Sequence, residues 1–320
     1  MDKNNKNIKE SLFQKSGVVS LLALIILLII MTIANRQFLS FGNIVNISRQ
    51  IAINGIVAAG MTFVILTGGI DLSVGAIMAL TGTATAACMI NYNMNYILAI
   101  IVGLIFGLLF GLLNGFLVSF LKIPAIIATL ATQMVARGLA LIYTGGYPMS
   151  GLPKETFGMI GNSYVLGVIP TPFVILVLVY IVSYMILNKR ALGRYIYALG
   201  GNEEAVRLSG INLKKTKLKP FIICGLFAAI AGIIATSRLL SGQPNSATGA
   251  EMDAIAAVVL GGTSIAGGKG HIFGSFIGAV ILGVISNGLN FMGATPYVQM
   301  VFKGVIIIFA IYASSKQDNK

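Results

Sequence analysis

The chain has 320 residues, of which 57% are hydrophobic and only 10% are charged. Soluble domains usually carry about a quarter charged residues, so this composition requires lipid rather than water around most of the chain. The formal net charge of +13 does not indicate nucleic-acid binding, because polytopic membrane proteins gather Lys and Arg on their cytoplasmic side and become basic without a polyanionic partner.

The apolar runs are long and continuous, which indicates helices, because backbone groups left unpaired in lipid cost several kcal/mol each. A helix needs about 20 apolar residues to cross about 30 Å of hydrocarbon. We predict an all-α polytopic membrane protein, with one transmembrane permease domain over residues 1–320 and about ten transmembrane helices. The predicted crossings are residues 17–34, 51–66, 73–90, 96–121, 124–143, 171–187, 220–240, 254–266, 272–290 and 297–312.

The N-terminal region resembles a secretory signal sequence, because lysines precede its apolar run. The run is long for such a signal, and residues 33–35 lack the small-x-small cleavage pattern, so we expect an uncleaved first crossing. With a cytoplasmic N-terminus, cytoplasmic segments hold 16 of the 22 Lys and Arg residues and external segments hold three. This excess predicts cytoplasmic termini, with residues 1–16 as an arm, residues 188–219 as a loop and residues 314–320 as a tail.

Two spaced similarities suggest an internal repeat. Asp71 and Asp253 each open a predicted crossing after a break in the apolar pattern, 182 residues apart. Asn114 and Asn287 each precede a Gly and close a glycine-spaced run, 173 residues apart. Crossings two to five would then match crossings seven to ten in opposite directions, as in transporters built from inverted repeats. So few matches also arise by chance, and both interpretations stay open.

The loop 188–219 is the longest polar stretch between crossings on the predicted cytoplasmic side. A glycine pair in it precedes a residue suited to cap a helix, two carboxylates suited to the first turn of that helix, and a short apolar stripe. An amphipathic helix of this kind fits either a groove on a partner protein or the lipid interface, and composition alone does not decide between them. The residues concerned are Gly200, Gly201, Asn202, Glu203, Ala205, Leu208, Ser209 and Gly210.

Residues for catalysis are scarce. The glycine-rich stretch 261–270 fails the phosphate-binding pattern, because Thr263 stands where Gly is needed and Gly270 stands where Ser or Thr would hold magnesium. His271 is the single histidine, and Cys88 and Cys224 are isolated in apolar runs. Metal sites, disulfides and Ser/His nucleophiles are therefore not indicated. We expect a chain that is not an enzyme and holds no cofactor or metal.

Charged side chains within or beside crossings are functional candidates, because a charge at mid-bilayer costs a few kcal/mol or more. We expect these charged side chains to form structural ion pairs or local pairs, and for Asp71 helix capping is the alternative. The residues are Asp71, Arg137, Arg238, Asp253 and Lys303. Uncharged polar residues in crossings either line a path for a hydroxylated solute or form hydrogen bonds between helices. The candidates for such a path are Asn54, Thr62, Thr83, Thr129 and Gln133.

Four stretches of the sequence stand out. They are ILTGGIDLSVGAIMALTG (65–82), LGRYIYALGGNEEAVRLSGIN (192–212), EMDAIAAVVLGGTSIAGGKGHIFGSFIGAVILG (251–283) and SNGLNFMG (286–293). Together they resemble the signature segments of the monosaccharide permeases of ABC importers, and the similarity extends over nearly the whole chain. Ribose is the first sugar to expect, although permeases for galactose, xylose and autoinducer-2 share much of these segments.

The resemblance implies a homodimer in the bacterial inner membrane, a two-domain cytoplasmic ATPase subunit that binds ATP and magnesium, and an external sugar-binding protein. It also implies that residues 200–210 form a coupling helix that seats in a groove of the ATPase. Replacing Glu203 or Gly201 is then expected to uncouple transport from ATP hydrolysis. Two alternatives remain: a facilitator or secondary carrier that works without an ATPase, and a polytopic membrane enzyme.

Overall fold

The computed structural model describes residues 16–318 as a bundle of helices with four very short strands. Residues 1–15 of the predicted arm and residues 319–320 of the predicted tail lie outside the described residues. The helices of the bundle are α2 (Ser16–Ala34), α3 (Phe41–Ile65), α4 (Val74–Ile90), α5 (Tyr96–Ser119), α6 (Ala125–Thr144), α8 (Thr171–Tyr184), α11 (Leu213–Leu239), α12 (Ala250–Leu260), α13 (Ile272–Phe291) and α14 (Pro296–Asp318).

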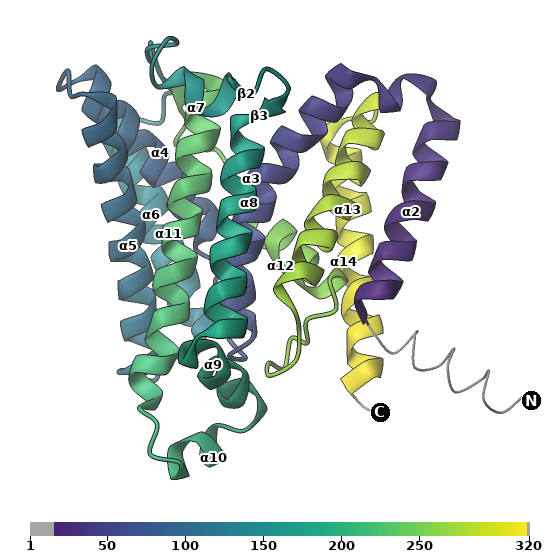
Figure 1. The fold of residues 1–320 in the computed structure, drawn as a ribbon. Coiled ribbons are helices and arrows are strands. Elements are labelled where there is room, and N and C mark those ends of the chain that lie inside the picture. Colours follow the sequence, from purple (N-terminus) through teal and green to yellow (C-terminus); the bar gives the residue numbers. More distant parts are fainter. Residues whose placement is uncertain (1–15, 319–320) are drawn as a thin grey trace, which may run out of the picture.

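Shorter elements lie at the two ends of the bundle (Figure 1). A π-helical turn, η2 (Met185–Lys189), extends α8 and leads into α9 (Ala191–Gly201) and α10 (Glu203–Leu208). The opposite end carries η1 (Arg36–Leu39), α7 (Gly158–Asn162), and two antiparallel strand pairs, β1 (Met149–Ser150) with β4 (Ser241–Gly242) and β2 (Tyr164–Val165) with β3 (Ile169–Pro170).

Consecutive long helices alternate in direction, so the start of α2 and the end of α14 lie at the same end of the bundle as α9 and α10 (Figure 1). Six of the described helices are long and apolar enough to cross a membrane, judged by length and composition: α3, α5, α6, α8 with its π-helical turn, α11 and α13. The all-α polytopic architecture expected from the sequence is therefore confirmed.

The centre and the periphery of the bundle differ in side-chain size. Helix α11 packs against α3, α4 and α5, and its contact with α5 is nearly backbone to backbone. A Cβ atom added at Gly111 of α5 would lie 2.6 Å from the carbonyl oxygen of Phe221 on α11. The outward face of α5 is lined by exposed Ile and Leu side chains, as a lipid-facing helix requires.

Two of the predicted crossings follow irregular stretches of the chain. The eighth, predicted over residues 254–266, is wrong as a full crossing, because α12 has 11 residues and is only about 16 Å long. Helix α12 begins part-way along the bundle (Figure 1). The irregular stretch 243–249 connects it to β4. The third crossing, predicted over residues 73–90, corresponds to the 17-residue helix α4, which follows the irregular stretch 66–73.

Packing supports the inverted repeat suggested by the sequence. Under that repeat α3, α4, α5 and α6 correspond to α11, α12, α13 and α14, and each pair runs in opposite directions (Figure 1). Helix α11 packs on α4 and α5, and α3 packs in the same way on α12 and α13. Likewise α4 contacts α6, and α12 contacts α14. The two halves thus repeat one arrangement of helices.

Candidate functional site

The α9–α10 segment is organised by its capping residues. The Asn202 side chain accepts a hydrogen bond from the backbone N–H of Ala205 at 2.9 Å and so caps α10 at its N-terminus. Glu203 and Glu204 lie in the first turn of α10, where carboxylates interact favourably with the helix dipole. The chain leaves α10 at Gly210, which adopts a φ of +73° that favours glycine. Gly200 and Gly201 are the last two residues of α9, and Asn202 follows them directly before α10.

Gly200, on the last turn of α9, lies against two other segments of the bundle. A Cβ atom at this position would overlap the carbonyl oxygen of Leu66 and the backbone nitrogen of Gly268. The same three segments are joined by a hydrogen bond from the Gly268 N–H to the Leu66 carbonyl, at 3.0 Å. A Cβ atom at Gly267 would likewise lie 2.7 Å from the Gly68 nitrogen. We call the cluster of Gly68, Gly200, Gly267 and Gly268 the glycine joint.

The glycine joint therefore ties α9 to both irregular connections at this end of the bundle. One connection is the stretch 66–73 between α3 and α4, and the other is the stretch 261–271 between α12 and α13. A second link is a hydrogen bond from the Tyr197 hydroxyl, on α9, to the Gly270 carbonyl at 3.0 Å. The two connections belong to opposite halves of the inverted repeat, so α9 contacts both halves.

Helix α10 projects from the bundle and is attached on one side only. Val206 is its buried residue, whereas Ala205 is exposed and Leu208 is 75% exposed. The apolar stripe expected from the sequence is therefore divided, with Val206 facing the bundle and Leu208 facing away from it.

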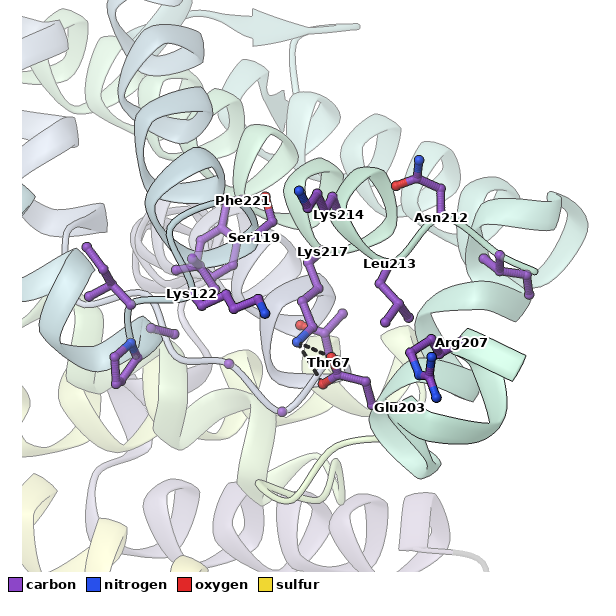
Figure 2. A pocket seen from close by; sticks show the side chains of 17 residues that line it. Thr67, Ser119, Lys122, Glu203, Arg207, Asn212, Leu213, Lys214, Lys217 and Phe221 are labelled. Atoms are coloured by element: carbon purple, nitrogen blue, oxygen red, sulfur yellow. Dashed lines mark hydrogen bonds and ion pairs between the residues drawn. The ribbon is translucent and has the colours of Figure 1, made fainter. Parts of the chain in front are cut away.

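An open groove of about 810 Å³ separates α10 from the bundle, between α11 and the turn that joins α5 to α6 (Figure 2). Lys122, Arg207, Lys214 and Lys217 give the groove a basic lining, against the single acid Glu203. Lys217 reaches from α11 to the Glu203 carboxylate at 2.7 Å. Since the two side chains are 27% and 53% exposed, this ion pair is a weak link that does not fix the position of α10.

The five candidate path residues are dispersed over α3, α4 and α6. The Thr62 hydroxyl is buried and donates to the Ala58 carbonyl at 2.7 Å and lies 2.8 Å from the Ser275 hydroxyl of α13. Thr83 is buried and bonds back to carbonyls of its own helix, and Thr129 accepts a hydrogen bond from the Leu72 N–H at 3.0 Å. Asn54 and Gln133 are half-buried on α3 and α6. These contacts favour hydrogen bonding between segments for Thr62 and Thr129, whereas Thr83 bonds within its own helix.

The five charged residues selected from the sequence contain one ion pair, between Lys303 Nζ and Asp253 Oδ2 at 2.6 Å. Arg137 instead donates to the carbonyl oxygens of Pro244 and Ser246, at 2.6 and 2.7 Å, and so holds the irregular stretch 243–249. Within the described part of the chain, Asp71 and Arg238 form no ion pair.

Asp71 belongs to a buried network that the sequence did not reveal. Its carboxylate accepts hydrogen bonds from the backbone N–H and the hydroxyl of Ser73, at 2.9 and 2.6 Å, at the start of α4. Asn114 of α5 donates to the Ser73 hydroxyl at 2.7 Å and accepts from Thr132 of α6 at 2.5 Å. The network joins three helices around the stretch 66–73, which explains how a buried carboxylate is accommodated there.

The N-termini of the two short helices α4 and α12 meet inside the bundle. A Cβ atom at Gly75, in the first turn of α4, would overlap the Ala247 carbonyl oxygen and lie 2.6 Å from Glu251 Oε2 in the first turn of α12. Glu251 is 8% exposed, and its Oε2 atom has no hydrogen-bond partner among the described residues. Paired short helices that meet at mid-depth are typical of the solute path in transporters.

The features missed from sequence share one property: they depend on contacts between segments distant along the chain. Nothing in the sequence of the stretch 261–271 indicates that its glycines contact α9. The polar stretch 243–249 (QPNSATG) was treated as a loop outside the membrane. Its polar residues, placed directly before a short apolar helix, were the available sign of a discontinuous crossing.

The comparisons with known proteins agree with this geometry. Residues 43–311 match the family model described as the branched-chain amino acid transport system permease component. The ribose import permease protein of Escherichia coli strain K12 is 47% identical over 302 residues, which cover 93% of this chain and 94% of that protein. The ribose import permease protein of Bacillus subtilis strain 168 is 48% identical over 310 residues, covering 97% and 95%.

A relative named for another pentose is more distant. The L-arabinose transport system permease protein of Escherichia coli strain K12 is 40% identical over 275 residues, covering 86% of this chain and 83% of that protein. No solved structure matches the chain. Because the family model covers most of the chain and the identities are high over nearly the full length, this chain belongs to the family of ABC-importer permeases that the model describes, among its sugar permeases.

Proposed function

We propose that this chain is the membrane-spanning permease subunit of an ATP-driven importer that brings ribose into the cytoplasm. The observation that carries the proposal is the attachment of the projecting α9–α10 segment to both halves of the inverted repeat through the glycine joint. Near-full-length similarity to proteins named as ribose import permeases supports the choice of sugar.

The orientation follows from charge. Residues 188–219 carry eight Lys and Arg residues, and the ends of α2 and α14 lie on the same side of the bundle (Figure 1). Positively charged segments remain on the cytoplasmic side of bacterial membranes. Both termini and the α9–α10 segment are therefore cytoplasmic in this proposal, and β1 to β4 with α7 face outward.

Three partners complete the importer. A cytoplasmic two-domain ATPase binds ATP and magnesium and receives α10, whose exposed Leu208 and Ala205 offer the apolar contact. A second copy of this chain forms the other wall of the path. An extracytoplasmic sugar-binding protein delivers ribose to the end that carries α7 and the strand pairs.

The mechanism is alternating access. Closure of the ATPase halves displaces α10, α9 moves with it, and the glycine joint passes the displacement to the stretches 66–73 and 261–271. Since these stretches precede α4 and α13, the two halves of the repeat rock against each other. The tight backbone contacts of the joint make this transmission stiff, whereas the open groove beside α10 leaves room for the movement.

Reconstitution tests the function directly. The chain, its ATPase and its binding protein are placed in proteoliposomes, and uptake of radiolabelled ribose is measured with and without ATP on the side of α10. We expect uptake that requires ATP, the ATPase and the binding protein, and that unlabelled ribose competes better than unlabelled arabinose or xylose. Equal uptake by the chain alone without ATP would favour a facilitator, and preferential competition by another sugar would replace ribose.

A further inference from the structure

A second groove, distant from α10, lies between α12 and α14. It has a volume of about 410 Å³ and is lined by the first turn of α12 with the residues just before it, and by the first turns of α14. The polar side chains in the lining are Thr248, Asp253, Gln299 and Lys303, and the apolar ones include Met252 and Met300. We refer to it as the α12–α14 groove.

The depth of the α12–α14 groove places it within the membrane. Lys303 lies seven residues after Pro296, the first residue of α14, and therefore about 10 Å along that helix from the outer end. The groove also borders the point where α12 begins part-way along the bundle (Figure 1). Polar groups and irregular backbone at such a depth are tolerated only where protein covers them or where they line a water-filled cavity.

The lining of the groove does not suit a lipid-facing surface. Thr248 is exposed and lies in the irregular stretch 243–249, and its hydroxyl donates to the Asn245 carbonyl at 3.1 Å, which leaves it able to accept a further hydrogen bond. The Lys303 and Asp253 side chains are 26% and 16% exposed and form their ion pair at the groove. Charged side chains in membrane segments usually mark a solute pathway, because hydrocarbon around them costs several kcal/mol.

The chemistry of the lining matches a polyhydroxylated solute. Lys303 offers N–H donors, Asp253 offers carboxylate acceptors, and Thr248 offers a hydroxyl, so neighbouring sugar hydroxyls can both donate and accept. Met252, Met300 and Pro296 offer apolar surface to the C–H faces of a sugar ring. The volume falls near the low end of the range of about 300–1,000 Å³ that small-molecule sites occupy, as a monosaccharide requires.

We propose that the α12–α14 groove is a monosaccharide subsite of the translocation path, in which Asp253, Lys303 and Thr248 exchange hydrogen bonds with the sugar. The proposal rests on the proposed function and adds the place where the sugar is held within this chain. The binding is weak, because a transported solute must leave the site as readily as it enters it.

Accessibility of a cysteine tests the position of the subsite. In a chain with Cys88→Ala and Cys224→Ala, Thr248→Cys is placed in the groove and Val301→Cys is placed on another face of α14. Val301 is 66% exposed and does not line the groove, so it is a matched control. The assembled importer is treated with a charged, membrane-impermeant thiol reagent, without nucleotide and after trapping with ATP and vanadate.

We expect the Thr248→Cys chain to react in at least one of the two states and saturating ribose to slow that reaction about tenfold, since an occupied site excludes the reagent. The Val301→Cys chain is expected to react slowly and without protection by ribose. An unreactive Thr248→Cys chain, or equal rates with and without ribose, would overturn the subsite.

Charge variants separate sugar binding from a structural ion pair. Asp253→Asn, Lys303→Met and the exchanged double variant Asp253→Lys with Lys303→Asp are compared for ribose uptake and basal ATP hydrolysis in the assembled importer. A solely structural pair would recover uptake in the exchanged variant. We expect all three to lose about tenfold in uptake at a fixed ribose concentration, and ATP hydrolysis without sugar reports whether each variant still assembles with the ATPase.

The two proposals fail in distinguishable ways. Wild-type proteoliposomes that take up no ribose with ATP defeat the proposed function whatever the variants do. Normal wild-type uptake with full recovery in the exchanged variant defeats the subsite alone.

Discussion

Helices α9 and α10 are neighbours in sequence but are held in opposite ways. The last turn of α9 contacts the rest of the bundle through backbone atoms at Gly200, with no side chain between the segments. Helix α10 is held by one buried residue, Val206, and by an exposed ion pair, and Leu208 faces away from the bundle. This difference in attachment fits the proposed roles, in which α9 transmits movement and α10 meets the partner.

The largest effect is expected at Gly200. A Gly200→Ala chain must accommodate a methyl group against backbone atoms of Leu66 and Gly268, which cannot rotate away. Overpacking of this kind costs about 1–3 kcal/mol. We expect ATP-driven ribose uptake to fall about tenfold or more, because each 1.4 kcal/mol is about a factor of ten. Size-exclusion chromatography and capture of the ATPase subunit show whether the variant still folds and assembles.

Gly201 supplies the matched control. It is exposed, and an added Cβ atom would have nothing within 4 Å. The Gly201→Ala chain should therefore transport ribose at close to the wild-type rate, with unchanged assembly. This result would assign coupling to Gly200 in the glycine joint and would contradict the sequence-based expectation that replacing Gly201 uncouples transport. Equal losses in the two variants would refute the role of the glycine joint.

A smaller effect is expected at Tyr197. Tyr197→Phe removes the hydrogen bond to the Gly270 carbonyl and leaves the ring in place, which costs about 0.5–1.5 kcal/mol. We expect a lower temperature of thermal unfolding in detergent and a loss of uptake smaller than that of Gly200→Ala. Tyr195→Phe, which changes an exposed tyrosine of the same helix, should behave as wild type. A Tyr197→Phe chain indistinguishable from Tyr195→Phe would remove this link from the account.

The smallest effect on ribose uptake is expected for a substitution on α10 itself, Glu204→Gln. Arg207 donates to the Glu204 carboxylate at 2.9 Å, and this hydrogen bond lowers the pKa of the Glu204 carboxyl. A carboxyl with a lowered pKa contributes to stability above its ordinary pKa, about 4.3, and loses that contribution as the pH falls through the lowered value. The ratio of uptake by Glu204→Gln to wild type should thus be constant between about pH 6 and pH 8. A ratio that changes across that range would show a titrating role for Glu204.

Local patterns in the sequence predicted much of the fold. Asn202 was recognised as a helix cap from its position before two carboxylates, and the structure places its side chain on the Ala205 N–H. Nine of the ten expected crossings correspond to helices that need only boundary changes, such as the start of α3 at Phe41 instead of residue 51. These features depend on residues within one or two helical turns, where propensity and hydropathy act.

Non-local contacts could not be predicted in the same way. Nothing in the run 261–270 shows that Gly267 and Gly268 lie against Gly200, because the contact joins residues 67 positions apart. The ion pair between Asp253 and Lys303 was one of several pairings that the sequence allowed. The sequence also could not show which of Gly200 and Gly201 contacts other segments of the bundle, because the two residues are chemically identical and adjacent.

The central claim is that α10 meets the ATPase, and a photocrosslinking residue at Leu208 tests it most directly. Membranes that contain the whole importer are illuminated, and the partner joined to this chain is identified by mass spectrometry. The account predicts a crosslink to the ATPase subunit from Leu208, which is 75% exposed, and none from a matched probe at Leu166, which is 89% exposed at the opposite end. A crosslink from Leu208 to the sugar-binding protein, or one to the ATPase from Leu166 instead, would contradict it.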